Sequence, residues 1–122
     1  MASMKPKILV VEDEPVIAML LRSLLAQRDV EVIGPFAHVE AAFKALGQQL
    51  INLALLDIQI GSEFAFSLAS ALVARRIPLV FVSGHGSNIL PTQFEGYPYL
   101  TKPFRTEELL AAVDRHLLRD AA

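Results

Sequence analysis

The sequence contains no cysteine among its 122 residues, which excludes disulfide bonds, thiolate metal sites and catalysis by a thiol. Basic residues are scattered, the longest basic run is Arg75-Arg76 and the formal net charge is −2, so no nucleic-acid-binding surface is predicted. No apolar run approaches the ~18 residues that a membrane span requires. The N-terminus also lacks the apolar segment of a secretory signal. These absences favour a cytoplasmic protein that binds neither nucleic acid nor membranes.

The length of the chain suits one domain rather than two. Because 53 % of its residues are apolar, the chain can build a core without disulfides or structural metals. Residues 1–3 precede a second methionine, Met4, and are interpreted as a cloning remnant. The predicted domain therefore covers residues 4–122, with no repeat or linker dividing it.

Short apolar runs alternate with amphipathic stretches along the chain. Pro15 suits the first turn of a helix, where its missing N–H is harmless, and Gly34-Pro35 is expected to end the second strand. Thr106 is expected to cap the last helix, with Glu107 and Glu108 favourable to the helix dipole. The predicted strands are 8–11, 30–32, 51–56, 79–82 and 99–101, and the apolar stripes of helices span 17–25, 39–50, 65–72 and 109–117.

The run 51–56 is apolar on both faces of the predicted strand, which requires cover on both faces and is typical of a parallel sheet. Five successive strand–helix units predict a doubly wound α/β fold with a five-stranded parallel sheet in the order 2-1-3-4-5. Residues 84–98 contain three glycines and two prolines with few apolar repeats. The fourth helix is therefore expected to be short.

Acidic residues follow two strands that are predicted to be neighbours. Glu12-Asp13 ends the first strand and Asp57 ends the third, and the winding of this sheet reverses between those strands, where ligands bind. Like charges this close together are unfavourable without a cation, and hard oxygen ligands favour Mg²⁺, with Mn²⁺ as an alternative. Solvated loop acids would explain one such residue, but acids at two neighbouring strand ends favour a metal site.

Two further strand ends carry groups of a different kind. Ser83 follows the fourth predicted strand and Lys102 follows the fifth. Each residue alone is common on a protein surface. Together with the carboxylates and a cation, however, they are suited to phosphoryl chemistry, because a metal and an ammonium neutralise phosphoryl oxygens and a carboxylate can be the nucleophile.

Four strand-end motifs resemble the response-regulator receiver family over nearly the whole chain: ILVVEDEP (8–15), LALLDI (53–58), VFVSG (80–84) and YLTKPF (99–104). The resemblance implies a flavodoxin-like fold. It also implies Mg²⁺-dependent transfer of a phosphoryl group to Asp57 from a histidine kinase or histidine phosphotransfer protein, which switches the surface that binds an output protein. Such a domain is a phosphoacceptor in signalling rather than an enzyme, and we expect a monomer or a weak homodimer.

The resemblance also implies roles for single residues. Asp57 looks like the phosphoacceptor. Asp13 matches the acid that holds the metal directly, Glu12 the acid that holds it through a water, and the backbone carbonyl of Gln59 would complete the metal shell. Lys102 is similar to the lysine that pairs with the phosphorylated aspartate.

Three other positions resemble parts of the receiver switch. Ser83 matches the hydroxyl that moves to a phosphate oxygen, and Tyr99 matches the switch aromatic that follows it. Gln59 and His85 match positions that overlook the acyl phosphate and tune its hydrolysis. A half-buried strand aromatic and a solvated loop histidine are the ordinary alternatives for Tyr99 and His85, and the signalling face would comprise the fourth helix, fifth strand and last helix.

The sequence departs from the usual receiver pattern. Most receivers have a Met-Pro-Gly turn after the phosphoacceptor, whereas this chain has Ile60-Gly61-Ser62. The runs LDIQIGSEFAF and ARRIPLVFVSG resemble a branch of stand-alone alphaproteobacterial receivers, although that branch has Phe-Ala-Thr-Gly-Tyr after its fourth strand. A phosphorylation-independent, receiver-like docking module therefore remains the alternative, and Phe66 and Phe94, if exposed, would mark an interface.

Overall fold

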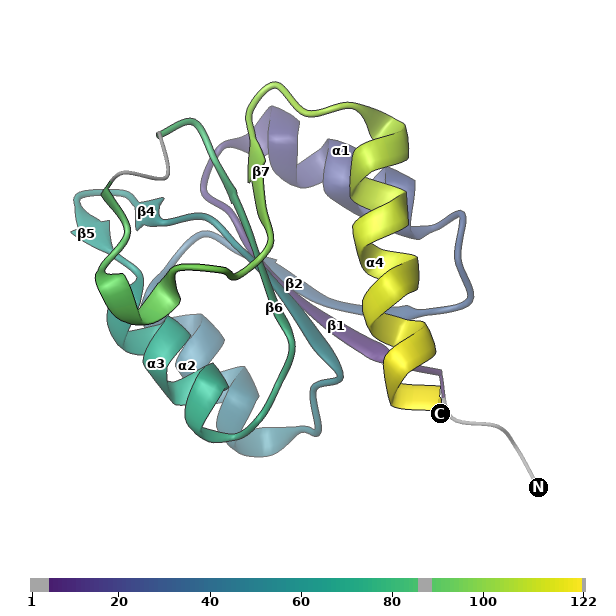
Figure 1. The fold of residues 1–122 in the computed structure, drawn as a ribbon, viewed down its shortest axis with the longest axis horizontal. Helices are drawn as coiled ribbons and strands as arrows, with labels where there is room; N and C mark the ends of the chain where they lie inside the picture. Colours follow the sequence, from purple (N-terminus) through teal and green to yellow (C-terminus); the bar gives the residue numbers. More distant parts are fainter. Residues whose placement is uncertain (1–4, 86–88, 122) are drawn as a thin grey trace.

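The alternating strands and helices form a three-layered α/β structure in the computed structural model (Figure 1). The structure describes residues 5–85 and 89–121, so the interpretation of residues 1–3 lies outside the described residues. The sheet contains β1 (Lys7–Val11), β2 (Glu31–Phe36), β3 (Leu53–Leu56), β6 (Leu79–Ser83) and β7 (Tyr99–Thr101), and the helices are α1 (Pro15–Leu25), α2 (Val39–Gln48), α3 (Phe66–Ala74) and α4 (Thr106–Ala121).

The five strands are all parallel and lie in the order β2-β1-β3-β6-β7. This is the predicted order 2-1-3-4-5 of a doubly wound sheet, which is confirmed. Val11 pairs with Leu56, and Ser83 pairs with Thr101. The residues that follow these strands therefore lie together at the carboxyl ends of the strands.

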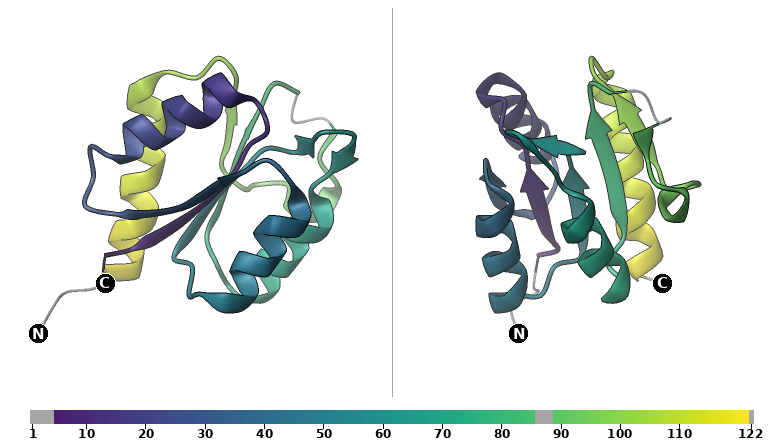
Figure 2. Two further views of the ribbon diagram at one scale, coloured as in Figure 1. Left: turned by 180° about the vertical axis from the view of Figure 1, so that it is seen from behind. Right: turned by 90° about the vertical axis from the view of Figure 1, so that its left-hand side faces the viewer.

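Helices cover both faces of the sheet: α1 and α4 lie on one side, and α2 and α3 lie on the other (Figure 2). All four residues of β3 are buried. Leu53 and Leu55 belong to the core beneath α1 and α4, whereas Ala54 and Leu56 belong to the core beneath α2 and α3. Burying one leucine side chain contributes about 1.5–3 kcal/mol, so this strand stabilises both halves of the core, as its two apolar faces predict.

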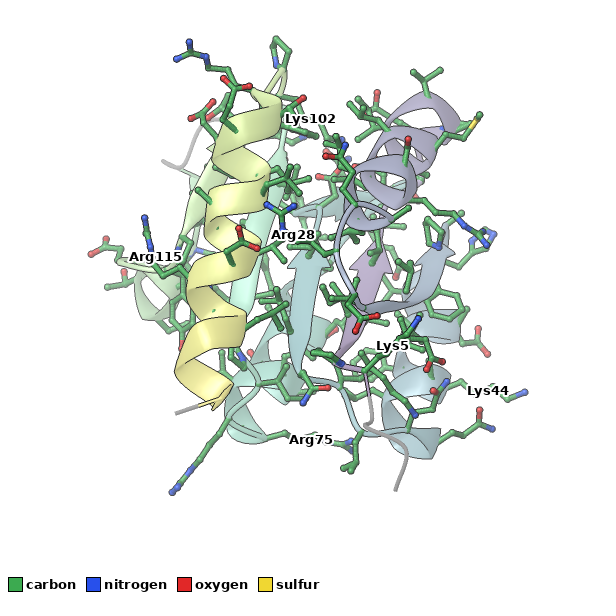
Figure 3. All side chains as sticks on the ribbon, turned by 90° about the vertical axis from the view of Figure 1, so that its right-hand side faces the viewer. Lys5, Arg28, Lys44, Arg75, Lys102 and Arg115 are labelled. Atoms are coloured by element: carbon green, nitrogen blue, oxygen red, sulfur yellow. The ribbon has the colours of Figure 1, made fainter. Side chains whose placement is uncertain are left out.

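An ion pair joins the two helices on one face of the sheet. Arg28, just after α1, donates from Nε to Asp114 Oδ1 at 2.7 Å and from Nη2 to Oδ2 at 2.9 Å. Figure 3 shows Arg28 pointing toward α4. The hydrogen bonds from Arg28 lower the pKa of the Asp114 carboxyl. Because both side chains are partly exposed, the pair contributes modestly to stability and mainly sets how α4 lies against α1.

Strand β2 corrects the prediction that Gly34-Pro35 ends the second strand. The strand continues to Phe36, and the register with β1 shifts between Leu9 and Val11. Gly34 has a φ of 112°, and a Cβ there would lie 2.6 Å from the Val10 carbonyl oxygen. Pro35 has no N–H to donate to a neighbouring strand. This is tolerated because β2 lies at the edge of the sheet, where one side of the strand is not paired.

A short antiparallel hairpin, β4 (Gln59–Ile60) with β5 (Glu63–Phe64), follows the end of β3. The sequence predicts only a turn there, because two-residue strands are too short to show a period. Gly61 has a φ of 63° at the turn. The hairpin positions the backbone N–H groups of Gln59 and Gly61 beside the acidic residues that follow β1 and β3.

The predicted shortening of the fourth helix agrees with the described residues between β6 and β7. Residues 89–98 contain a short 3-10 helix, η2 (Thr92–Phe94). Phe94, which would mark an interface if exposed, is 1 % exposed, and its ring contacts Phe81 and Phe66 at centroid distances of 5.7 and 6.1 Å. Because its ring packs against Phe81 of β6, Phe94 belongs to the core, and Phe66 is half-buried.

The last helix begins at Thr106 itself, so the prediction that Thr106 precedes the helix as its cap is wrong. The N–H of Arg105 donates to Glu108 Oε1 at 3.0 Å, which fixes the start of the helix through a carboxylate in its first turn. Among the described helices, none combines the length and the apolar character needed to cross a membrane.

Candidate functional site

Three carboxylates gather at the carboxyl edge of the sheet. Glu12 and Asp13 follow β1, Asp57 follows β3, and one oxygen of each lies within 4.8 Å of the others. Glu12 is 2 % exposed and Asp57 is 5 % exposed, whereas Asp13 is half-buried. The structure thus brings together the three acids that the sequence singles out.

The ammonium group of Lys102 lies next to two of these acids and to Glu14. Its Nζ is 2.8 Å from Asp57 Oδ2, 2.7 Å from Glu12 Oε1 and 2.7 Å from Glu14 Oε1. Burial by itself lowers the pKa of Lys102, but the hydrogen bonds to the carboxylates outweigh it, so the pKa is raised above the ordinary 10.5. Lys102 is therefore a permanently charged cation at the centre of the cluster.

Glu14 is the one contact of Lys102 that the sequence analysis missed. Glu14 follows Glu12-Asp13 in a run of three acids, and this run is the sequence signal from which a role at the site could have been predicted. The side chain of Glu14 is 60 % exposed, whereas that of Glu12 is 1 % exposed. Lys102 therefore has two carboxylate partners inside the site and one at its surface.

Glu12 is held as a buried carboxylate with one oxygen poorly satisfied. The Glu14 N–H donates to its Oε2 at 3.0 Å, but its buried Oε1 accepts no hydrogen bond, although the Lys102 ammonium lies close. Burial raises the pKa of the Glu12 carboxyl, and the neighbouring N–H and ammonium offset this only in part. An oxygen in this state is suited to a further cation.

The donor set fits a hard divalent cation. It consists of carboxylate oxygens, one of them buried without a hydrogen bond, and such oxygens are the ligands that Mg²⁺ prefers. Backbone groups hold the acids in place: the Gly61 N–H donates to Asp13 Oδ2 at 2.7 Å, and the Gln59 N–H donates to Asp57 Oδ1 at 3.3 Å. Gln59, predicted as a ligand through its carbonyl, therefore lies directly beside Asp57.

Ser83, His85 and Tyr99 form a second group next to the acids. Ser83 is fully buried at the end of β6, and its Oγ accepts a hydrogen bond from the His85 N–H at 3.3 Å. The Tyr99 hydroxyl donates to the carbonyl of His85. Burial raises the pKa of Tyr99, and the charge of Asp57 adds to this while the Ser83 hydroxyl opposes it. The predicted switch residues thus lie together within the electrostatic reach of Asp57.

A surface groove of about 680 Å³ lies elsewhere, at the amino ends of β6 and β7. Ile77, Tyr97 and His116 are among its lining residues, and none of the predicted site residues lines it. The groove is therefore separate from the acidic site.

Residues 8–114 match the family described as the response regulator receiver domain, and the chain belongs to this family. The chain is 30 % identical over 114 residues to the sensory transduction protein LytT of Bacillus cereus, covering 90 % of this chain and 46 % of that protein. It is 32 % identical over 123 residues to the phosphate regulon transcriptional regulatory protein PhoB of Rhizobium meliloti, covering 95 % and 54 %. The chain thus spans about half the length of these curated relatives.

Solved structures show the same fold. The solution structure of SdrG from Sphingomonas melonis Fr1 has a TM-score of 0.81 at 35 % identity, covering 95 % of this chain and 99 % of that one. SdrG from Pseudomonas melonis Fr1 in its BeF3-activated conformation has a TM-score of 0.77 at 36 % identity, covering 96 % and 99 %. The predicted flavodoxin-like receiver fold is confirmed. Accepting a phosphoryl group is the role of this family, whose members bind Mg²⁺ and interact with kinases or phosphotransfer proteins and with output partners.

Proposed function

We propose that Asp57 is the phosphoacceptor of this receiver domain. The carboxylate of Asp57 lies in the cluster with Glu12 and Asp13 and also forms an ion pair of 2.8 Å with Lys102. This double environment is the observation that carries the proposal. A phosphoryl group on Asp57 would have positive charge available from the Lys102 ammonium and from a cation held by the acidic cluster. Stabilisation of developing charge by groups already in place is usually the largest single contribution to catalysis.

The proposed reaction is an in-line displacement at phosphorus. An oxygen of Asp57 attacks the phosphorus of a phosphohistidine, the P–N bond breaks, and its electron pair returns to the imidazole nitrogen, which leaves an acyl phosphate on Asp57. Lys102 provides an N–H donor to a phosphoryl oxygen. A Mg²⁺ ion held by Glu12, Asp13, Asp57 and the Gln59 carbonyl would supply the remaining neutralisation of phosphoryl charge.

The phosphodonor that we propose is a histidine kinase or a histidine phosphotransfer protein. Such a donor must bring its imidazole to the carboxyl edge of the sheet, next to the start of α1. Val16 and Met19 are 76 % and 72 % exposed on the first turns of this helix, directly after Glu14. Exposed apolar side chains beside a charged site are typical of a protein-binding surface, which supports approach of the donor over α1.

The switch that we propose joins Ser83 to Tyr99. When a dianion forms on Asp57, the Ser83 hydroxyl moves to a phosphoryl oxygen and Tyr99 follows it. The change is read on the face formed by the η2 segment, β7 and α4. Inward movement of the loop 84–91 is part of the same proposal, and residues 86–88 of that loop lie outside the described residues.

Phosphorylation by acetyl phosphate, followed by intact mass, tests the assignment of Asp57. We expect the wild-type protein to gain one phosphoryl group only when Mg²⁺ is present, and the Asp57→Asn variant to gain none. Asp29→Asn is the matched control, because Asp29 is highly exposed and pairs with Lys5 outside this site. Phosphorylation of Asp57→Asn would overturn the assignment. A folded wild-type protein that gains nothing would favour the phosphorylation-independent docking module.

A further inference from the structure

The ammonium of Lys102 already lies among three carboxylates before any phosphoryl group arrives. It donates hydrogen bonds to Asp57 Oδ2 and Glu14 Oε1, and Glu12 Oε1 lies 2.7 Å away as an ion-pair partner. Glu12 and Asp57 belong to the cluster that fits a divalent cation, but Glu14 does not. A phosphoryl oxygen that binds Lys102 must therefore compete with these carboxylates for the ammonium.

The backbone of Glu14 holds its side chain in position. Its N–H donates to Glu12 Oε2 at 3.0 Å, and its carbonyl accepts from the Ala18 N–H at 2.8 Å in the first turn of α1. The residue is thus fixed on one side to the acidic site and on the other to a helix. Its exposed carboxylate reaches Lys102 Nζ at 2.7 Å, although the two residues are separated by 88 positions in the sequence.

We propose that Glu14 is a positioning residue that holds Lys102 in the unphosphorylated site and competes with the phosphoryl group for the ammonium. This inference rests on the proposed function of Asp57. A cation bound at the cluster would compensate the charges of Glu12, Asp13 and Asp57, whereas Glu14, among the described residues, has Lys102 as its ion-pair partner. Glu14 therefore opposes a dianion on Asp57 in two ways, because it occupies an N–H donor and adds a like charge nearby.

Removing the charge of Glu14 should strengthen the binding of a phosphoryl analogue. For a partly exposed charge at this range we expect an effect of about three- to tenfold. The effect should shrink at high ionic strength, because salt screens an exposed carboxylate more than a buried one. A side chain that only supported the fold would not produce this salt dependence.

Beryllofluoride is the probe, titrated into the Mg²⁺-saturated protein and followed by the amide signals of residues 57–61 in NMR spectra. We expect Glu14→Gln to bind it about three- to tenfold more tightly than wild type at low salt, with a smaller difference at high salt. Glu14→Asp, which keeps the charge but has a shorter reach, should lie between the two. Glu63→Gln is the matched control, because Glu63 is an exposed acid on the neighbouring hairpin, and it should resemble wild type.

The outcomes separate the two proposals. Unchanged or weaker binding by Glu14→Gln, while wild type binds and Asp57→Asn does not, would overturn the role of Glu14 and leave Asp57 as the acceptor. If wild type neither binds beryllofluoride nor gains a phosphoryl group from acetyl phosphate, the proposed function fails and the role of Glu14 fails with it. Equal tightening by Glu63→Gln would assign the effect to general charge and also overturn the proposal.

Discussion

The Tyr99 hydroxyl donates a hydrogen bond to the backbone carbonyl of His85, and the N–H of the same His85 donates to Ser83 Oγ. One residue of the loop after β6 thus connects the two predicted switch residues. Movement of the Ser83 hydroxyl toward a phosphoryl group would break or shift the hydrogen bond from the His85 N–H and leave the Tyr99 hydroxyl to follow. In the proposed switch, the hydroxyl of Tyr99 would therefore act as well as its aromatic ring.

Tyr99→Phe tests this dependence. A hydrogen bond of this kind contributes about 0.5–1.5 kcal/mol, so we expect a small loss of stability, a shifted and faster-exchanging His85 amide, and phosphoryl uptake that persists with a smaller conformational response. NMR spectra with and without beryllofluoride measure this. Tyr97→Phe is the control, because Tyr97 packs on the same Phe81 ring. A His85 amide that is identical in Tyr99→Phe and wild type would contradict the prediction.

His85→Ala tests whether the histidine tunes the lifetime of the acyl phosphate. Both observed contacts of His85 use its backbone, so the substitution removes the exposed imidazole and leaves these contacts in place. We expect a longer lifetime, because an imidazole near the phosphoryl group assists attack by water. Phosphate release from the isolated phosphoprotein measures it, with His38→Ala as the control. Equal lifetimes for wild type and His85→Ala would end the hypothesis.

Asp13→Asn should weaken Mg²⁺ binding by about tenfold or more, as loss of a charged metal contact does. The asparagine side-chain oxygen can still accept the hydrogen bond from the Gly61 N–H, so the hairpin stays anchored and the lost charge is isolated. Calorimetry with Mg²⁺ gives the affinity. Mn²⁺ offers a second measurement, because it should broaden the amide signals of Gln59 and Gly61 in wild type. Undiminished Mg²⁺ affinity in Asp13→Asn would place the cation elsewhere.

Lys102→Met should change how stability depends on pH. In wild type the raised pKa of Lys102 means that its stabilising contribution is complete below the ordinary 10.5 and is lost as the pH rises through the folded-state pKa. The pKa of Glu12 is already raised by burial, and removing the ammonium raises it further. A carboxyl of this kind lowers stability in full above its folded-state pKa, and the penalty fades as the pH falls from that pKa to the ordinary 4.5.

We therefore expect Lys102→Met to be about 3 kcal/mol less stable than wild type near neutral pH, as when a buried ion pair loses one partner. The difference should narrow on acidification or when Mg²⁺ is added, since either change removes the uncompensated negative charge. Thermal unfolding at several pH values measures this, and Lys44→Met on the surface of α2 controls for the lost lysine. A stability difference that does not vary with pH or Mg²⁺ would show that the three carboxylates do not repel one another.

Two glycines provide a matched test of the irregular strand β2. Gly34→Ala should lower the free energy of unfolding by about 3 kcal/mol or more, because its φ of 112° and the 2.6 Å approach to the Val10 carbonyl both oppose a side chain. Gly47→Ala should raise it by about 0.5–1 kcal/mol, because Gly47 is helical and a Cβ there meets open space. Denaturant unfolding of both variants measures these changes in the free energy of unfolding. Equal effects would mean that the conformation at Gly34 is not specifically required.

The arrangement of the sheet, and the end of it at which the site lies, follow from the sequence. The apolar run ending in Asp57 is buried on both faces and so requires a parallel sheet, and parallel strands end at a common edge. Glu12, Asp57 and Lys102 each follow a strand and Ser83 ends one, so their convergence was predictable from their positions at strand ends. The motifs at those strand ends were equally sufficient for the family.

Other features follow from the fold, because they depend on contacts between residues that are distant in sequence. Residue patterns report whether a face is buried, but not which surface buries it. The burial of Phe94 depends on its packing against Phe81 of β6 and Phe66 of α3, and β2 continues through Gly34-Pro35 because it lies at the edge of the sheet. The contact between Glu14 and Lys102 requires the turn into α1 and the end of β7 to meet over Asp57, which no local pattern specifies.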